Sequence, residues 1–355
     1  MIRAQAVIDR AALAHNLRRV RDLAPDSRVY AAVKADGYGH GAITVAQALH
    51  EADGFAVSSL DEALQLRWAG IDKPVAMLSQ QLDATVCDQA AENRLEIVVF
   101  HDSQLDVLAS YIGPPLTVWI KLDSGMHRLG FASERAGEIE RRVAALARVE
   151  VAGWLTHLAC ADEPSRPETR AQLDNFAGAT SGRAGLRSIA NSAGVLAWPE
   201  AHADVVRPGI MLYGSSPMLD RDAARCGLEP AMHLTAPLIA RNRIAAGETI
   251  GYGATWRTPQ DMDVGVIGIG YGDGYPRHAP SGTPVLLNGG RVPLVGRVSM
   301  DMITVDLRDA PDARVGDRAT LWGGGLDVDE VARYSGTIAY ELFCRLTPRV
   351  RFEVV

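Results

Sequence analysis

Two hydrophobic patterns alternate along the first two thirds of the chain. Short apolar runs rich in β-branched residues are typical of buried strands. Longer stretches between them repeat apolar residues every three or four positions, as amphipathic helices do. The strands are expected at residues 28–33, 55–57, 75–78, 96–99, 117–121, 151–156, 187–190 and 204–206.

Helix signals support this alternation. Asp9 has the residue type that caps a helix, and apolar residues with helical spacing follow it. Ser59 and Glu62 have the spacing of a capping box, and residues 133–146 carry their apolar positions on one side. Eight strands, each followed by a helical stretch, predict a (β/α)8 TIM-type barrel, with a doubly wound open sheet as the alternative.

The pattern changes near Pro230, where helical periodicity mostly stops. Short strands punctuated by Gly and Pro follow, which predicts a mostly β second domain. We therefore predict an α/β protein with a barrel domain at residues 1–229 and a β domain at residues 230–355. The β strands are expected at 233–243, 264–269, 284–287, 292–295, 303–306 and 319–321.

Composition narrows the class of protein. The net charge of -7, without a basic block, argues against nucleic acid as a partner. No apolar run is long enough to span a bilayer, and the segment from Met1 to Gln5 lacks a signal-peptide layout. The four cysteines are scattered, which predicts reduced thiols in a cytoplasmic protein. No metal-ligand spacing stands out.

Polar residues gather where the predicted barrel strands end, which is where TIM barrels place their chemistry. Lys34 closes the first strand, at the edge of a partly desolvated site that favours its neutral amine. Such an amine can form a Schiff base with an aldehyde. A solvated lysine just beyond a strand is the plainer interpretation, but Gly37, Gly39 and Gly41 allow the backbone to approach a ligand closely.

The last two strands offer a second signal. Asn191 to Gly194 supply a hydroxyl, backbone amides and a helix start, and Gly209-Ile210 add further amides. Many barrels bind phosphate with these two loops. Either segment alone is also compatible with an ordinary helix cap.

These segments resemble the alanine racemase family. The resemblance covers essentially the whole chain in the expected order, through nine motifs. They are AVKADGYGHG, KLDSGMHRLG, THLACADE, NSAG, RPGIMLYG, GYGATW, GYGDGYPR, VGRVSMDM and YELFCRL.

The resemblance implies two-base racemisation of alanine with pyridoxal 5'-phosphate. Lys34 would hold the cofactor as a Schiff base and act on one face of the substrate. Tyr252 matches the base on the other face, which the family supplies from the partner subunit of a homodimer. His157 and Arg207 match the groups that stabilise its phenolate. Arg207 also matches the arginine facing the pyridine nitrogen, which disfavours a protonated ring.

Further roles follow from the same resemblance. Arg128 matches the arginine that contacts the ring hydroxyl and the substrate carboxylate, and Lys121 matches a lysine that is carbamylated in several members. Residues matching the remaining cofactor contacts, mainly to phosphate, are Tyr38, Asn191, Ser192, Gly209, Ile210 and Tyr340. Substrate contacts reaching across the dimer are expected from Tyr271, Met300 and Asp301.

Two departures and three alternatives accompany this assignment. Ser299 stands where some members have cysteine, and Asp36 where asparagine is frequent.

A decarboxylase of the same plan would need a glutamate near the pyridine nitrogen and a distal cysteine, with which Arg207 and Ser299 disagree. A non-enzymatic cofactor carrier would lack the second domain. A racemase acting on serine or lysine is harder to separate from the alanine enzyme.

Overall fold

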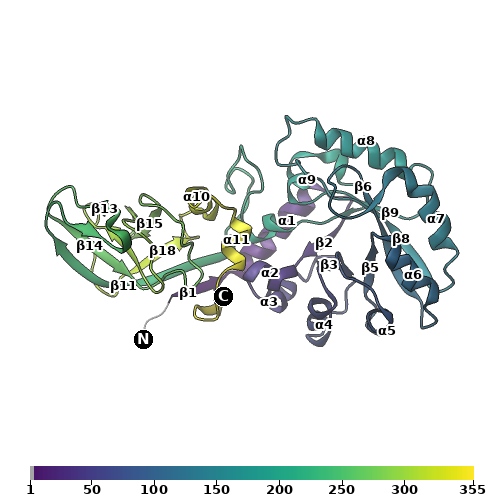
Figure 1. Cartoon of the computed structure of the whole chain (residues 1–355), viewed down its shortest axis with the longest axis horizontal. Coiled ribbons are helices and arrows are strands. Elements are labelled where there is room, and N and C mark those ends of the chain that lie inside the picture. The colour runs from purple at the N-terminus through teal and green to yellow at the C-terminus, as the bar shows by residue number, and fades with distance from the viewer. Residues whose placement is uncertain (1–3) are drawn as a thin grey trace.

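The computed structural model describes residues 4–355. Residues 1–3, which carried part of the signal-peptide argument, lie outside the described residues. Figure 1 shows a rounded lobe of strands and helices beside an elongated lobe rich in strands, with the long strand β11 (Met232–Ile244) running between them. Between residues 4 and 355, no helix combines the length and apolar character needed to cross a membrane.

A closed barrel of eight parallel strands forms the first lobe. Each strand pairs with the next, and β10 pairs back with β2, which closes the ring and rules out the open sheet. The predicted TIM-type barrel is therefore confirmed. Its strands are β2 (Arg28–Ala32), β3 (Gly54–Val57), β4 (Val75–Met77), β5 (Glu96–Val99), β6 (Leu116–Asp123), β8 (Val149–Leu155), β9 (Leu186–Ser188) and β10 (Val205–Val206).

Helices follow the strands and cover the outside of the barrel (Figure 1). They are α1 (Arg10–Leu23), α2 (Lys34–Gly39), α3 (Ala42–Ala48), α4 (Leu60–Trp68), α5 (Ala84–Glu92), α6 (Asp102–Ser110), α7 (Ala136–Ala144), α8 (Glu168–Thr180) and α9 (Ser192–Ala197). Asp9 caps α1 as predicted, accepting from the amides of Ala11 and Ala12. The last strand leads only into a short 3-10 turn, Ile210–Tyr213.

The barrel interior contains a hydrogen-bonded polar group. Tyr30, Val98, Trp119 and Leu155 belong to a small buried cluster, separate from the main core, whose strand residues come from six barrel strands. The Trp119 indole donates to the Glu96 carboxylate at 2.7 Å, and the Tyr30 hydroxyl donates to it at 3.1 Å. Trp119 is thus a core residue, and these two donors satisfy a carboxylate that would otherwise be costly to bury.

The second lobe is mostly β, as expected. Its main strands, besides β11, are β14 (Met262–Ile267), β15 (Pro284–Leu287), β16 (Gly290–Pro293), β17 (Ile303–Asp306) and β18 (Arg318–Trp322). The sequence patterns missed β12 (Thr249–Ile250), β13 (Trp256–Arg257), β19 (Arg351–Val354), α10 (Val328–Tyr334) and α11 (Ala339–Cys344). Most of these are too short to show periodicity.

An unpredicted strand joins the beginning of the described chain to this second lobe. β1 (Gln5–Ile8) pairs antiparallel with β11 and parallel with β19. Residues 5–8 therefore belong to the sheet formed otherwise by strands after residue 231.

An unusual turn connects β2 to the first barrel helix. Four consecutive residues, Ala35 to Tyr38, have φ between 51° and 60°, so α2 is largely a left-handed turn directly after Lys34. Left-handed geometry costs a residue other than glycine about 1–2 kcal/mol. Ala35, Asp36 and Tyr38 are such residues, so surrounding structure must hold this turn.

Trp119→Phe is expected to destabilise the protein by about 1–3 kcal/mol, because Glu96 loses a buried hydrogen-bond donor. Trp68→Phe is the control, since Trp68 is 78% exposed, and its effect should stay within about 0.5 kcal/mol. Chemical unfolding of both variants measures the difference. If Trp119→Phe has the same free energy of unfolding as Trp68→Phe, the bond from the indole to Glu96 contributes nothing to stability.

Ala35→Gly is expected to raise the free energy of unfolding by up to about 1 kcal/mol, because glycine relieves left-handed strain while adding freedom to the unfolded chain. The same change at Ala177, exposed within the regular helix α8, should instead cost about 1 kcal/mol. The opposite signs are read from urea unfolding curves. Destabilisation by both changes would contradict the strain.

Candidate functional site

A cavity of about 360 Å³ lies at the carboxyl ends of the barrel strands. It brings together every residue predicted to bind the cofactor. Its lining consists of Ala32, Lys34, Ala35, Tyr38, Leu78, Arg128, His157, Asn191, Ser192, Arg207, Gly209, Ile210, Tyr340 and Cys344. Tyr340 and Cys344 belong to α11, so the second lobe contributes one wall.

Positive charge dominates this site. A second cavity of about 280 Å³ shares Lys34, Arg128, His157 and Arg207 with the first and adds Lys121. Neither lining includes an Asp or a Glu. A site with four cationic side chains and no acidic side chain is suited to binding an anion.

Burial and mutual repulsion alter the protonation of these groups. Burial, followed by the Arg128 charge, lowers the pKa of Lys34. Burial and the Arg207 charge lower the pKa of Lys121 to about 8. The pKa of His157 falls well below its usual value for the same two reasons, so this imidazole is neutral at pH 7. A larger fraction of each lysine amine is therefore neutral at pH 7 and able to act as a nucleophile or to accept a proton.

Arg207 is held firmly inside the barrel. Its guanidinium donates to the Ser188 hydroxyl and, at 2.5 Å, to the backbone carbonyl of Thr156. Burial lowers its pKa to about 10. Since that value is still well above 7, Arg207 keeps its charge at neutral pH.

Gly209 and Tyr38 approach each other closely in the cavity lining. A Cβ atom on Gly209 would lie 2.5 Å from the Tyr38 hydroxyl, so a side chain there would force Tyr38 to shift. The Ser192 hydroxyl accepts from the Gly209 amide at 2.8 Å. The Tyr38 ring packs between those of Tyr213 and Tyr340, with centroid distances of 4.7 and 5.8 Å.

Asn191 lines the cavity, but its side chain is largely occupied elsewhere. Its carbonyl oxygen accepts from the Gly194 amide at 2.9 Å, which caps α9, and its amide donates to the Leu158 carbonyl at 3.3 Å. The contacts of the Asn191 side chain therefore include those of a helix cap.

The remaining predicted residues lie apart from the cavity. Tyr252 is 67% exposed on the second lobe, and Tyr271 and Met300 are also exposed there. The Tyr271 amide donates to the Ser299 carbonyl, which places Tyr271 beside the Met300 segment. Asp301 pairs with Arg349 at 2.6 Å. In the single chain these four residues are exposed, and none of them belongs to the cavity lining.

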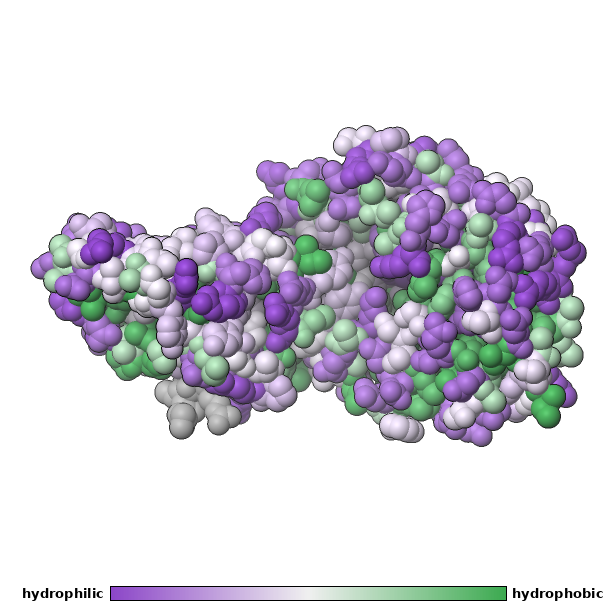
Figure 2. Space-filling view, viewed as in Figure 1, coloured by the Kyte–Doolittle hydropathy of each residue, from purple (hydrophilic) through white to green (hydrophobic). Residues whose placement is uncertain are grey.

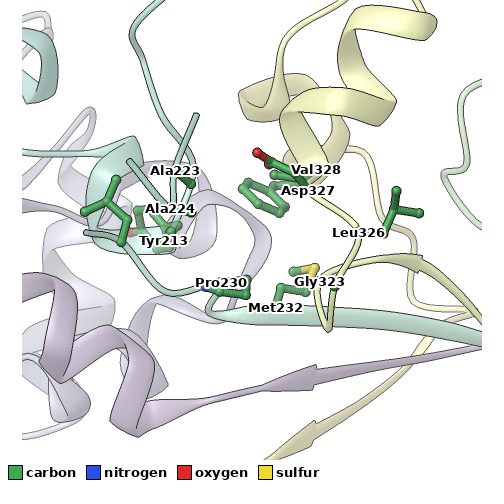
Figure 3. Close-up of a pocket in the computed structure, with 13 residues that line it drawn as sticks. Tyr213, Ala223, Ala224, Pro230, Met232, Gly323, Leu326, Asp327 and Val328 are labelled. Atoms are coloured by element: carbon green, nitrogen blue, oxygen red, sulfur yellow. The ribbon is translucent and has the colours of Figure 1, made fainter. Parts of the chain in front are cut away.

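A different cavity, of about 250 Å³, lies between the two lobes (Figure 3). Apolar side chains such as Met232, Leu326 and Phe343 make up much of its lining, and Asp327 is its one acidic residue. No Lys, Arg or His lines it. Because it lacks converging reactive groups, it is not the candidate active site.

Sequence reasoning missed some residues of the site. Cys344 and Leu78 line the main cavity, although neither has a polar strand-end pattern. Cys344 lies within the quoted motif YELFCRL, which was the available signal. Ser188 had no signal, since its hydroxyl acts on the site indirectly: it accepts from Arg207 and donates to the Val205 carbonyl at 2.7 Å.

Two family models match most of the chain. The family described as "Alanine racemase, N-terminal domain" matches residues 8–217, and "Alanine racemase, C-terminal domain" matches residues 231–354. The chain is 53% identical to an alanine racemase of Nitrosococcus oceani, with 98% of each chain covered. It is 50% identical to one of Halorhodospira halophila, covering 99% of this chain and 98% of the relative.

Solved structures agree with these sequence matches. The biosynthetic alanine racemase of Pseudomonas aeruginosa superposes with a TM-score of 0.97 at 46% identity, with both chains fully covered. An alanine racemase of Bacillus anthracis with bound L-Ala-P gives a TM-score of 0.88 at 31% identity, covering 100% of this chain and 95% of that one. This chain belongs to the alanine racemase family.

Proposed function

We propose that this protein interconverts L-alanine and D-alanine, with pyridoxal 5'-phosphate as cofactor and Lys34 as its attachment point. The observation that carries the proposal is the cationic cavity around Lys34, Arg128, His157 and Arg207 at the carboxyl end of the barrel. The relatives named alanine racemase, about 50% identical over the full chain, support the choice of substrate.

The residues present fit this cofactor. The Lys34 amine is buried and has a lowered pKa, which suits attack on an aldehyde. The part of the lining where Gly209 leaves room beside the Tyr38 hydroxyl suits a phosphate. When bound, pyridoxal phosphate would supply an electron sink that acidifies the α-proton of an attached amino acid.

Each part of the cavity has a proposed role. The phosphate would be held by Tyr38, Ser192, Gly209, Ile210 and Tyr340, and Asn191 would be a further residue of the cofactor site. Arg207 would face the pyridine nitrogen, and because it stays protonated it would keep that nitrogen unprotonated. Arg128 would hold the substrate carboxylate with its planar fork.

Racemisation needs a proton acceptor on one face of the α-carbon and a donor on the other. We assign Lys34 to one face and Tyr252 of a partner subunit to the other. Tyr252, Tyr271 and Met300 are exposed in the single chain, as residues completing a partner's site must be. A homodimer with shared sites follows, and substrate contacts from Tyr271, Met300 and Asp301 belong to the same proposal.

Lys121 is proposed to be carbamylated. With its pKa near 8, a substantial fraction of the amine is neutral near physiological pH and reacts with carbon dioxide, releasing one proton. The resulting anion would lie in the cavity that Arg128 and Arg207 also line. It would offset part of the positive charge there and orient Arg128.

The wider setting is also a proposal. The chain would divide near residue 230 into a barrel domain and a β domain that completes the partner's site. Scattered, unpaired cysteines favour the cytoplasm, where D-alanine would serve cell-wall precursors. A decarboxylase is disfavoured because Arg207 and Ser299 stand where that enzyme would need a glutamate and a cysteine.

Racemisation is tested by following the circular dichroism of L-alanine and of D-alanine with purified protein. Both signals should decay to zero, and only with pyridoxal phosphate present. Protein that carries the cofactor on Lys34 yet leaves alanine unchanged would refute the substrate. L-Serine, L-lysine and assays for carbon dioxide release then identify the alternative reaction.

Tyr252→Phe is expected to slow α-proton removal from L-alanine by about 10²–10⁴-fold while leaving cofactor binding intact, since one base is lost. Exchange of the α-proton with deuterated solvent measures the step. Tyr334→Phe, an exposed tyrosine on α10 of the same lobe, is the control. Full activity of Tyr252→Phe in both directions would refute the two-base assignment.

Carbamylation of Lys121 predicts a carbamate resonance in the carbon-13 spectrum of protein incubated with labelled bicarbonate. The chain has only three lysines, Lys34, Lys73 and Lys121, which simplifies the assignment. Lys121→Arg should abolish the resonance and Lys73→Arg should retain it. A spectrum without the signal in the unaltered protein would exclude the modification.

A further inference from the structure

One carboxylate outside the cavity reaches the backbone directly beside Lys34. Glu62 lies in the first turn of α4 and is half-buried. One of its oxygens accepts from the Ala35 amide at 2.7 Å, and the other accepts from the Ser58 amide at 2.6 Å. The side chain therefore links the loop after β2 to the loop after β3.

This arrangement differs from the capping box that the sequence predicted. Ser59 does cap α4, accepting from the Glu62 amide at 3.4 Å. In a capping box the glutamate would accept from the amide of the capping residue itself. Glu62 accepts instead from the residue before it and from Ala35, so its position serves a neighbouring loop as well as its own helix.

The bond to Ala35 acts on the strained part of the chain. Ala35 is the first of the four residues with left-handed φ. Other bonds of this turn are local: the Gly37 amide donates to the Val33 carbonyl, and the Ala42 amide donates to the Asp36 carboxylate. Glu62 adds a contact from a separate element at the residue that follows Lys34, where backbone direction sets where the lysine points.

Glu62 also contributes charge. Burial and the nearby Arg128 and Arg207 disfavour a protonated Lys34, whereas the Glu62 carboxylate acts in the opposite direction. The one other group with that effect among the main influences is the Cys344 thiol. A single residue thus combines a geometric and an electrostatic effect on Lys34.

We propose that Glu62 is a positioning residue that fixes the left-handed turn after Lys34 and so aims the lysine amine into the cavity. This inference rests on the proposed function, since it concerns the lysine that would hold pyridoxal phosphate. Glu62 itself does not line the cavity, and it acts through the Ala35 amide.

The test compares Glu62→Gln with Asp83→Asn in the full-length protein. The glutamine loses the charge, and its side-chain NH2, which replaces one carboxylate oxygen, can only donate and so cannot accept from the second backbone amide. Asp83 is a matched control because its carboxylate also caps a barrel helix, accepting from Val86 at 2.8 Å, away from Lys34. Both variants are loaded with pyridoxal phosphate, and Lys34 attachment is confirmed by reduction and peptide mapping.

Three measurements are made on each variant. They are the affinity for pyridoxal phosphate, the pH dependence of the bound cofactor's absorption, and hydrogen exchange of the peptide spanning residues 33–42 in apoprotein. Glu62→Gln should bind the cofactor about tenfold more weakly, move the absorption change to lower pH and exchange faster. Asp83→Asn should match the unaltered protein in all three.

The outcomes separate the two proposals. If Glu62→Gln behaves like Asp83→Asn in cofactor affinity and in exchange, the positioning role is refuted while the racemase stands. If the unaltered protein never attaches the cofactor to Lys34, the proposed function fails, and the exchange comparison still decides whether Glu62 holds the turn.

Glu62→Asp is a second variant that distinguishes the proposed effect from misfolding of the glutamine variant. Aspartate keeps the charge but is one methylene shorter, so it cannot span both amides. It should retain the pH midpoint of the unaltered protein while losing part of the exchange protection. An aspartate variant with the pH shift of the glutamine variant would overturn the electrostatic part of the proposal.

Discussion

Four cationic side chains share one partly buried region, and the rest of the site is arranged around that constraint. Lys34, Lys121, Arg128 and Arg207 line two adjoining cavities without an acidic residue. Burying like charges together is unfavourable, so the pKa values of Lys34 and Lys121 fall, whereas Arg207, with a pKa of about 10, keeps its proton at neutral pH. The protein thereby separates groups that can move protons from groups that supply fixed charge.

The barrel supplies the rigidity that this separation needs. Arg207 is anchored by the Ser188 hydroxyl and the Thr156 carbonyl, both from strand ends on the same side of the ring. The face seen in Figure 2 mixes hydrophilic and hydrophobic residues, with hydrophobic ones gathered on the lower part of the rounded lobe. The four cationic side chains, by contrast, converge on the two cavities at the end of the barrel.

The sequence predicted the barrel well because short apolar runs alternate with helical stretches many times along the first two thirds of the chain. It also predicted which residues meet, since parallel strands that end in polar residues bring those residues to one mouth. The family resemblance then identified Tyr252, Tyr271 and Met300, which no periodicity marks and which the single chain leaves exposed.

Local backbone conformation was beyond the sequence patterns. Three of the four left-handed residues after Lys34 are not glycine, so their residue types do not predict a positive φ. Glu62 looked like a routine helix cap, because its bond to Ala35 depends on how two strands lie side by side. The strands β1 and β19 were missed for a similar reason, since their pairing is entirely long-range.

That long-range pairing bears on how the chain is made. Gln5 lies opposite Thr235 in one neighbouring strand and Arg351 in the other. During synthesis the barrel strands emerge before either partner of β1, so the barrel sheet is able to close while β1 still has exposed backbone edges. The sheet around β1 is completed only after β11 and β19 have been made, later than every barrel strand. Until then β1 has two unpaired backbone edges, which are open to pairing with other chains.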